Sequence, residues 1–127
     1  MTTKIGTMGW LDITDEQAPA LRDFYQSVVG FQIEAMSMDD YDDYILKTAD
    51  GETMVAGIVN KRGPNAEVPK GWIPYFVVAD LDQSLEQVTG LGGQIIGNER
   101  SYGDGRFCFI RDPSDAICAL FQEGESS

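Results

Sequence analysis

Histidine is absent from this 127-residue chain, and that absence excludes more than any other feature of its composition. Without an imidazole there can be no Ser-His-Asp triad, no histidine general base and no histidine-bound metal ion. Cysteine is nearly absent as well, because Cys108 and Cys118 are the only two. Two cysteines are too few for a disulfide scaffold, so we expect both thiols to be reduced and buried.

Long apolar runs are also missing. No stretch approaches the roughly 20 apolar residues that a membrane-spanning helix needs. Residues 1–10 contain one lysine and no apolar segment typical of a signal peptide, so the sequence predicts none. We therefore expect a cytoplasmic protein without a membrane partner.

Basic residues are scarce, with 9 Lys and Arg against 21 Asp and Glu and a net charge of −12. A field of that sign repels nucleic acid, so we expect no nucleic-acid partner. The acidity has two interpretations that the sequence leaves open. It either keeps the protein soluble, as in a salty cytoplasm, or it attracts a cationic ligand.

Hydrophobic residues make up 43% of the chain, which is enough for one core and one domain over residues 1–127. In the first half, a strand at 7–14 precedes a helix with Asp15 as its predicted N-cap and Gly30 as its C-cap. The elements expected after this helix are strands at 44–48 and 53–59 around a two-residue Asp50-Gly51 hairpin, and a linker at 60–71.

The second half repeats this plan. A strand at 72–78 precedes a helix whose start, Asp80 followed by Gln83, resembles a capping box. Glycines end this helix, and two further strands surround a proline-containing turn. These later elements are Gly90, Gly92 and Gly93, the strands at 106–110 and 116–121, and the turn Asp112-Pro113-Ser114-Asp115.

The two halves align as an internal repeat. Gly9-Trp10 recurs as Gly71-Trp72, and Asp50 recurs as Asp112, each after 62 residues. The repeat predicts two strand–helix–strands modules, at about 5–60 and 72–122, joined by the linker at 60–71. Neither module can bury its apolar face well alone.

Three local motifs carry a resemblance to a known family. They are the helix Leu21-Arg22-Asp23-Phe24-Tyr25 running to Gly30-Phe31, the Gly92-Gly93 pair, and the turn Asp112-Pro113-Ser114-Asp115 before the last strand. Their order and spacing resemble the glyoxalase, bleomycin-resistance and extradiol-dioxygenase (vicinal oxygen chelate) superfamily. The resemblance implies an α+β fold of paired βαβββ modules, with a curved, cup-like mixed sheet and the helices outside.

The resemblance also locates the superfamily's metal site, with one ligand on the first strand and one on the last strand of each module. The corresponding positions are Trp10, Trp72 (or Ile73), Gly57 (or Val55 or Ala56) and Ala119. None of these side chains is a ligand for a divalent ion. We therefore expect no metal and no other cofactor, and metal-dependent glyoxalase or dioxygenase activity is not expected.

Strand alternation assigns the candidate ligand-binding residues. Leu11, Ile13, Ile73, Tyr75 and Val77 are predicted to pack under the helices, which directs Trp10, Asp12, Trp72 and Phe76 into the cup. The tryptophans either fill the core or form two aromatic walls. Asp12 either makes a salt bridge, for example to Arg106, or contacts a ligand, with a catalytic role as general base as a tentative alternative.

Two loops are predicted at the opening of the cup. Met36, Met38 and Tyr41 are expected to form an adaptable lip in the polar stretch 35–44. The segment 98–105, which contains Tyr102, is expected to be a mobile loop. Arg106 completes the predicted ligand-binding set, either as a partner for a carboxylate or as an internal counter-charge.

The sequence therefore predicts a metal-independent protein that binds or sequesters a small, aromatic or cationic molecule, as resistance-type members of the superfamily do. The alternative is a glyoxalase-like lyase or dioxygenase-type enzyme with a non-standard site built on Asp12 and a tyrosine. The resemblance also implies a homodimer.

Overall fold

The computed structural model describes residues 4–124, so the two ends of the expected 1–127 domain lie outside the described residues. Within this part of the chain, eight strands and two α-helices form, with both parallel and antiparallel strand pairs, which confirms the predicted α+β class. The chain divides into two compact units. We call residues 11–72 the α1 unit, and residues 4–10 together with 73–124 the α2 unit, after the helix that each contains.

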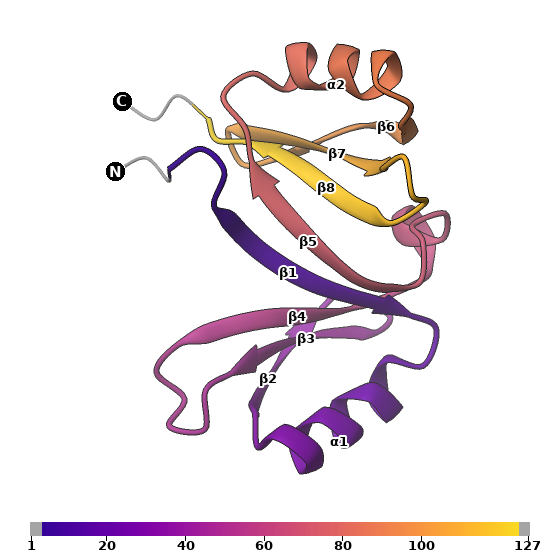
Figure 1. The fold of residues 1–127 in the computed structure, drawn as a ribbon. Coiled ribbons are helices and arrows are strands. Elements are labelled where there is room, and N and C mark those ends of the chain that lie inside the picture. Colours follow the sequence, from indigo (N-terminus) through magenta and orange to yellow (C-terminus); the bar gives the residue numbers. More distant parts are fainter. Residues whose placement is uncertain (1–3, 125–127) are drawn as a thin grey trace. The chain divides into compact units, whose positions relative to one another are not determined.

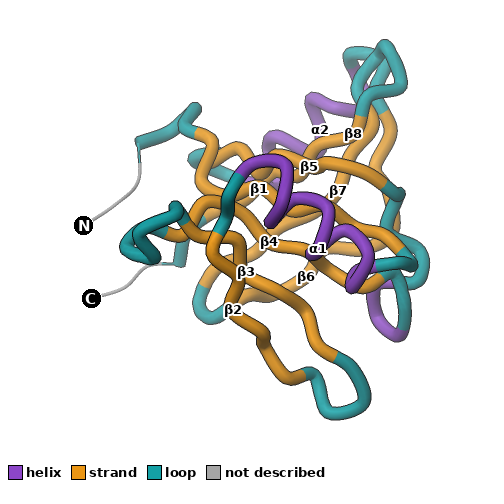
Figure 2. Tube along the Cα trace, turned by 90° about the horizontal axis from the view of Figure 1, so that it is seen from below, coloured by secondary structure: helices purple, strands orange, loops and turns teal. Residues whose placement is uncertain are grey.

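The α1 unit is built around a four-stranded mixed sheet. Its elements are β1 (Met8–Asp15), α1 (Ala18–Val29), β2 (Gln32–Ser37), β3 (Asp42–Lys47) and β4 (Met54–Asn60). The strand order is β2-β3-β4-β1, in which β4 and β1 are parallel and the other pairs antiparallel. Helix α1 lies across one face of these strands (Figures 1 and 2).

The α2 unit has the same plan. Its elements are β5 (Gly71–Val77), α2 (Leu81–Gly90), β6 (Gln94–Tyr102), β7 (Gly105–Arg111) and β8 (Ile117–Gln122). The strand order is β5-β8-β7-β6, with β5 and β8 parallel. Val77 at the end of β5 donates its N–H to the carbonyl of Thr7 at 2.9 Å, which attaches the N-terminal segment to this unit.

The helix ends follow local rules, with one exception. Asp80 accepts a hydrogen bond from the Gln83 N–H at 3.1 Å, so the predicted N-cap of α2 is confirmed. Gly30 ends α1 in a left-handed conformation, φ +92°, as predicted. Asp15 is not the N-cap of α1: it ends β1, and its side chain accepts the Gln17 N–H at 2.8 Å.

The two aspartates of the repeat close equivalent turns. Asp50 accepts hydrogen bonds from the Thr48 hydroxyl and the Glu52 N–H, and Asp112 accepts them from Ser114 and Ala116. These bonds stabilise the charged form and lower the pKa of both carboxyls. The Asp50 connection is longer than predicted, because Thr48 N–H pairs with the Thr53 carbonyl across four loop residues.

Two strands occupy segments for which the sequence predicted polar loops. Strand β2 begins at Gln32 and takes in the first residues of the stretch 35–44, and β6 continues to Tyr102 within the stretch 98–105. Both are edge strands with mostly exposed side chains, so they lack the alternation of apolar residues that reveals a half-buried strand. The expected mobile loop is reduced to a two-residue turn, with Tyr102 paired to Gly105.

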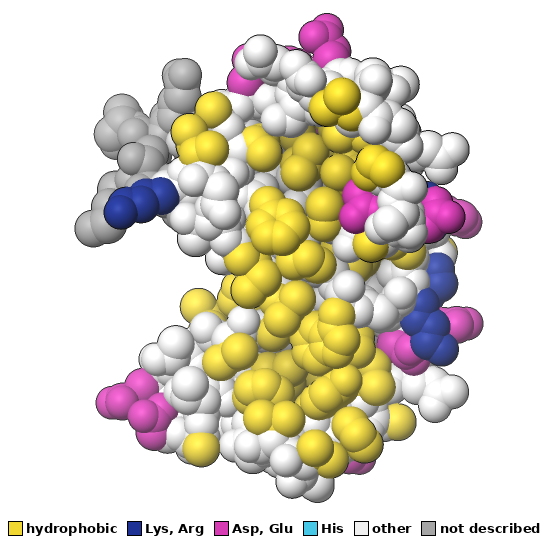
Figure 3. Space-filling model, in the orientation of Figure 1, with side chains coloured by type: hydrophobic (Ala, Val, Ile, Leu, Met, Phe, Trp, Pro, Cys, Tyr) yellow, Lys and Arg dark blue, Asp and Glu magenta, His cyan; other side chains and the backbone are white. Residues whose placement is uncertain are grey.

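Each unit has its own buried side chains. In the α1 unit they are Ile13, Ala18, Tyr44, Leu46, Ala56 and Ile58, and in the α2 unit they include Ile73, Val77, Leu81, Cys108, Phe109 and Ala119. Hydrophobic side chains also gather on the visible face of each unit, with carboxylates around the margins (Figure 3). Neither helix within residues 4–124 is long and apolar enough to cross a membrane.

Candidate functional site

The faces of the α1 sheet are as the sequence predicts. Ile13 is buried, Leu11 packs beside it, and both contribute to the core that α1 covers. Asp12 therefore lies on the opposite face, where it is half-buried and pairs in register with Gly57 of β4. Glu34 and Lys47 form an ion pair on that same face, so Asp12 belongs to a partly polar surface.

The faces of β5 are the reverse of the prediction. Phe76 pairs with Leu120, which pairs with Cys108. The same side of these strands carries Gln122, whose side chain accepts the N–H of Leu81 at the start of α2. Phe76 therefore lies on the α2 side of its sheet, and the prediction that Tyr75 packs under α2 is wrong.

The physical reason is a shift of one residue between the two modules. On the last strands Gly57 corresponds to Ala119, but their partners on the first strands are Asp12 and Tyr75. The Gly-Trp pairs that suggested a spacing of 62 residues are therefore out of structural register by one. Because strand side chains alternate, a slip of one residue exchanges the two faces.

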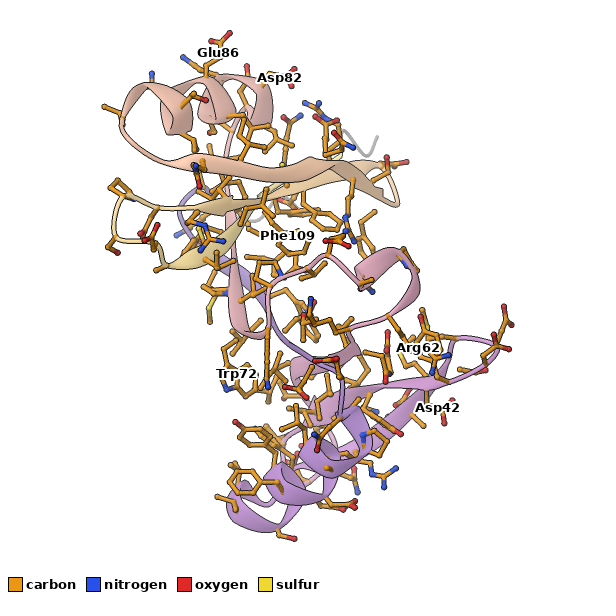
Figure 4. The ribbon with its side chains drawn as sticks, turned by 90° about the vertical axis from the view of Figure 1, so that its right-hand side faces the viewer. Asp42, Arg62, Trp72, Asp82, Glu86 and Phe109 are labelled. Atoms are coloured by element: carbon orange, nitrogen blue, oxygen red, sulfur yellow. The ribbon has the colours of Figure 1, made fainter. Side chains whose placement is uncertain are left out.

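The face of the α2 unit that points away from α2 is aromatic. The Tyr75 ring centroid lies 5.5 Å from that of Phe107 and 5.9 Å from that of Phe109, and the latter two are 5.6 Å apart in an edge-to-face arrangement. Figure 4 shows Phe109 on the side of the sheet away from Asp82 and Glu86 of α2. We call Tyr75, Phe107 and Phe109 the aromatic face.

The aromatic face was missed in the sequence because two of its rings lie on β7, where the alternation between Phe107 and Phe109 was not used. Arg100 shares this face, since it pairs with Phe107, and its guanidinium lies 5.3 Å from the Phe109 ring centroid. Phe109 is buried, at 4% exposure, whereas Phe107 is half-buried. Phe107 is therefore the more accessible ring.

Trp72 has a different environment from the one predicted. Its indole N–H donates to the Tyr25 hydroxyl of α1 at 3.2 Å, and the two rings pack edge to face with centroids 5.3 Å apart. It lies beside α1 (Figure 4), and is thus not brought to the face that carries Asp12. Trp10 is half-buried on β1, two residues before Asp12.

Arg106 lies on the α2 side of its sheet, away from the aromatic face. Its guanidinium donates to Glu99 at 2.9 Å, to Asp82 at 3.3 Å and to Gln122 at 3.0 Å. The bond to Glu99 is the largest reason why the pKa of Arg106 is raised. These bonds hold β6, β7, β8 and α2 together, which is the role of the internal counter-charge.

The two loop tyrosines lie in different units. Tyr41 packs against Arg62, whose guanidinium carbon is 4.3 Å from the ring centroid; Arg62 and Asp42 are labelled in Figure 4. Tyr102 lies at the tip of the β6–β7 hairpin and is 72% exposed. It shares a face with Arg100, two residues earlier on the same strand.

The donor set does not fit the metal ion that the superfamily implies. The paired positions are Asp12 with Gly57 in one unit and Tyr75 with Ala119 in the other, so a single carboxylate is present among them. In residues 4–124, no three His, Cys, Asp or Glu side chains gather in a way that could hold a metal. Both cysteines are unpaired, and burial raises the pKa of each thiol.

The fold is shared with solved structures of low sequence identity. A hypothetical protein BH1468 from Bacillus halodurans aligns with a TM-score of 0.62 at 13% identity, covering 98% of this chain and 99% of that one. Methylmalonyl-CoA epimerase from Mycobacterium tuberculosis aligns with a TM-score of 0.57 at 15% identity, covering 98% of this chain and 93% of that one. These likenesses concern the fold alone.

Sequence relatives are longer. "Putative glyoxylase CFP32" of Mycobacterium bovis is 31% identical over 92% of this chain and 46% of its own length. "Anthracycline biosynthesis protein DnrV" of Streptomyces peucetius is 27% identical over 87% of this chain and 39% of its own length. The chain thus spans less than half the length of these relatives. The family model that matches residues 7–117 is that of the Glyoxalase/Bleomycin resistance protein/Dioxygenase superfamily, and the chain belongs to that superfamily.

Proposed function

We propose that this protein binds a small planar molecule without a metal ion, and that the ligand stacks on the aromatic face. The observation that carries the proposal is the cluster of Tyr75, Phe107 and Phe109 beside Ala119, on the strand face where the superfamily has its metal ligands. Aromatic rings supply flat contact area and no ligand for a divalent ion.

The geometry supports stacking through one ring in particular. Phe109 is buried and Arg100 lies over it, so Phe109 acts as a packed floor. Phe107 is half-buried and meets Phe109 edge to face, which leaves part of its surface accessible to a ligand. A stacked aromatic contact contributes about 0.5–1.5 kcal/mol beyond the area that it buries.

Charge supports a neutral or cationic ligand over an anionic one. The net charge of −12 raises the local concentration of cations and repels anions such as glutathione adducts. The name of the relative DnrV concerns anthracyclines. Anthracyclines with an amino sugar combine a planar chromophore with a cationic amine, which makes doxorubicin a suitable first probe for this chain.

The test is a fluorescence titration with three probes: doxorubicin, its neutral aglycone and S-lactoylglutathione as the anionic conjugate. We expect doxorubicin to bind most tightly and the anion most weakly. Phe107→Leu should weaken doxorubicin binding by about two- to tenfold, the equivalent of one stacking contact. Phe24→Leu is the matched control, because Phe24 lies on α1 and is 54% exposed.

Tighter binding of the anion, or equal losses in the two leucine variants, would contradict the proposal. Asp12→Asn tests the electrostatic part of it and should weaken the cationic probe relative to the aglycone. Mass spectrometry of the titrated probes also checks the alternative activity: chemical conversion that disappears in Asp12→Asn would favour an enzyme built on this carboxylate.

A further inference from the structure

A second, smaller pocket lies at the tip of the β6–β7 hairpin, within the α2 unit. Its volume is about 240 Å³, and the residues that line it come from this turn and from the end of β8: Tyr102, Asp104, Gly105, Phe121, Glu123 and Gly124. Two of these residues are aromatic and two carry carboxylates. The aromatic face of the proposed function contains none of them.

Two glycines fix the shape of this pocket. A Cβ atom on Gly105 would lie 2.8 Å from Phe121 Cζ, and a Cβ atom on Gly124 would lie 2.1 Å from Asp104 Cβ. Both distances are below any real Cβ contact, so the ring of Phe121 and the backbone after β8 can approach the hairpin only because these side chains are absent. The pocket is therefore a feature of close backbone packing.

We propose that this pocket binds a small organic ammonium group. A cation is attracted to the face of an aromatic ring, here Tyr102 or Phe121, and the carboxylates of Asp104 and Glu123 add an attraction of the same sign. The combination of rings and carboxylates suits an alkylated amine better than a metal ion, because the rings offer no ligand atoms.

The nearest cationic side chains are oriented elsewhere. Arg100, which shares the strand face of Tyr102, lies over the Phe109 ring at 5.3 Å. Arg106 is on the opposite face, bound to Glu99, Asp82 and Gln122. The local balance of two carboxylates is therefore not reversed by these arginines, and the overall charge of −12 acts in the same direction.

The probe for this site is tetramethylammonium chloride, with tert-butanol as a neutral probe of similar shape and sodium chloride to match ionic strength. Heteronuclear NMR on the full chain would follow the amide signals of Gly103, Gly105 and Gly124. We expect saturable shifts of these signals with tetramethylammonium and no saturable shifts with tert-butanol. Rising salt should weaken the binding, because the carboxylates are partly screened.

Variants separate the pocket from the general negative field. Glu123→Gln and Tyr102→Leu should each weaken tetramethylammonium binding by about two- to fivefold, the size of one exposed charge or cation–π contact. Glu86→Gln, on the outer side of α2 (Figure 4), changes the net charge equally and should leave binding unchanged. Phe107→Leu should also leave it unchanged, so this proposal and the proposed function can fail separately.

Three results would overturn the inference. Shifts that do not saturate, or that tert-butanol reproduces, would show that the pocket has no preference for a cation. Equal losses in Glu123→Gln and Glu86→Gln would show that only the net charge of the protein attracts the probe. Dispersed spectra of each variant would establish that these results come from folded protein.

Discussion

Replacement of Phe109 by alanine tests whether the aromatic face has a packed floor. Phe109 is 4% exposed and contacts both Tyr75 and Phe107, so its removal deletes a buried ring and leaves a cavity. Truncation of a buried phenylalanine costs about 3–5 kcal/mol. Since domains of this size are stable by about 5–15 kcal/mol, the variant should remain folded but become much less stable.

Urea unfolding followed by circular dichroism measures this loss. For an expected m-value of about 2 kcal/mol/M, the midpoint of Phe109→Ala should fall by about 2 M relative to wild type. Phe107→Ala should lose about half as much free energy of unfolding, because its ring is only half-buried. Phe24→Ala, on the exposed side of α1, should stay within about 0.5 kcal/mol of wild type.

The ranking of the three variants is the informative result. If Phe109→Ala costs less than about 1 kcal/mol, the ring is not a packed floor and the aromatic face is looser than its burial indicates. If Phe107→Ala costs as much as Phe109→Ala, Phe107 serves packing, and its proposed role in stacking a ligand loses its basis.

Four further expectations can be measured directly. Protein purified without added metal should contain no stoichiometric divalent ion, and one zinc, nickel, iron or manganese ion per chain retained through dialysis against a weak chelator would contradict this. Light scattering should give about twice the chain mass of 14.0 kDa, as expected for a homodimer, and a monomer mass at micromolar concentration would refute it. Cys108 and Cys118 should react slowly with a thiol reagent at neutral pH and faster as pH rises, because their raised pKa values reduce the thiolate fraction; rapid modification of folded protein at pH 7 would show otherwise. Asp80→Ala should lower the free energy of unfolding by about 1 kcal/mol through loss of the cap on Gln83, and an unchanged urea midpoint would argue against that role.

Local features were predictable where one short segment contains the whole interaction. The cap from Asp80 to Gln83 spans three residues, and the left-handed end of α1 needs only a glycine at position 30. The turn at Asp112 is equally local, since its acceptor oxygen and the N–H groups of Ser114 and Ala116 lie within four residues. Asp15 misled for the same reason, because it bonds Gln17 within a strand end.

Edge strands were not predictable in the same way. Strands β2 and β6 have exposed side chains along most of their length, so what makes them strands is hydrogen bonding to β3 and β7 and not an apolar pattern. Propensity alone does not supply those partners.

The candidate site divides along the same line. Composition alone established that histidine chemistry is impossible and that the chain is strongly acidic, and the motifs alone placed it in its superfamily. Only the tertiary structure decided that Tyr75, Phe107 and Phe109 share one face, that Phe76 faces α2, and that Trp72 packs on Tyr25. The reason is that strand faces depend on pairing between segments distant in the chain, such as Tyr75 with Ala119. A repeat in the sequence can be shifted by one residue against that pairing, and one residue is enough to exchange the faces.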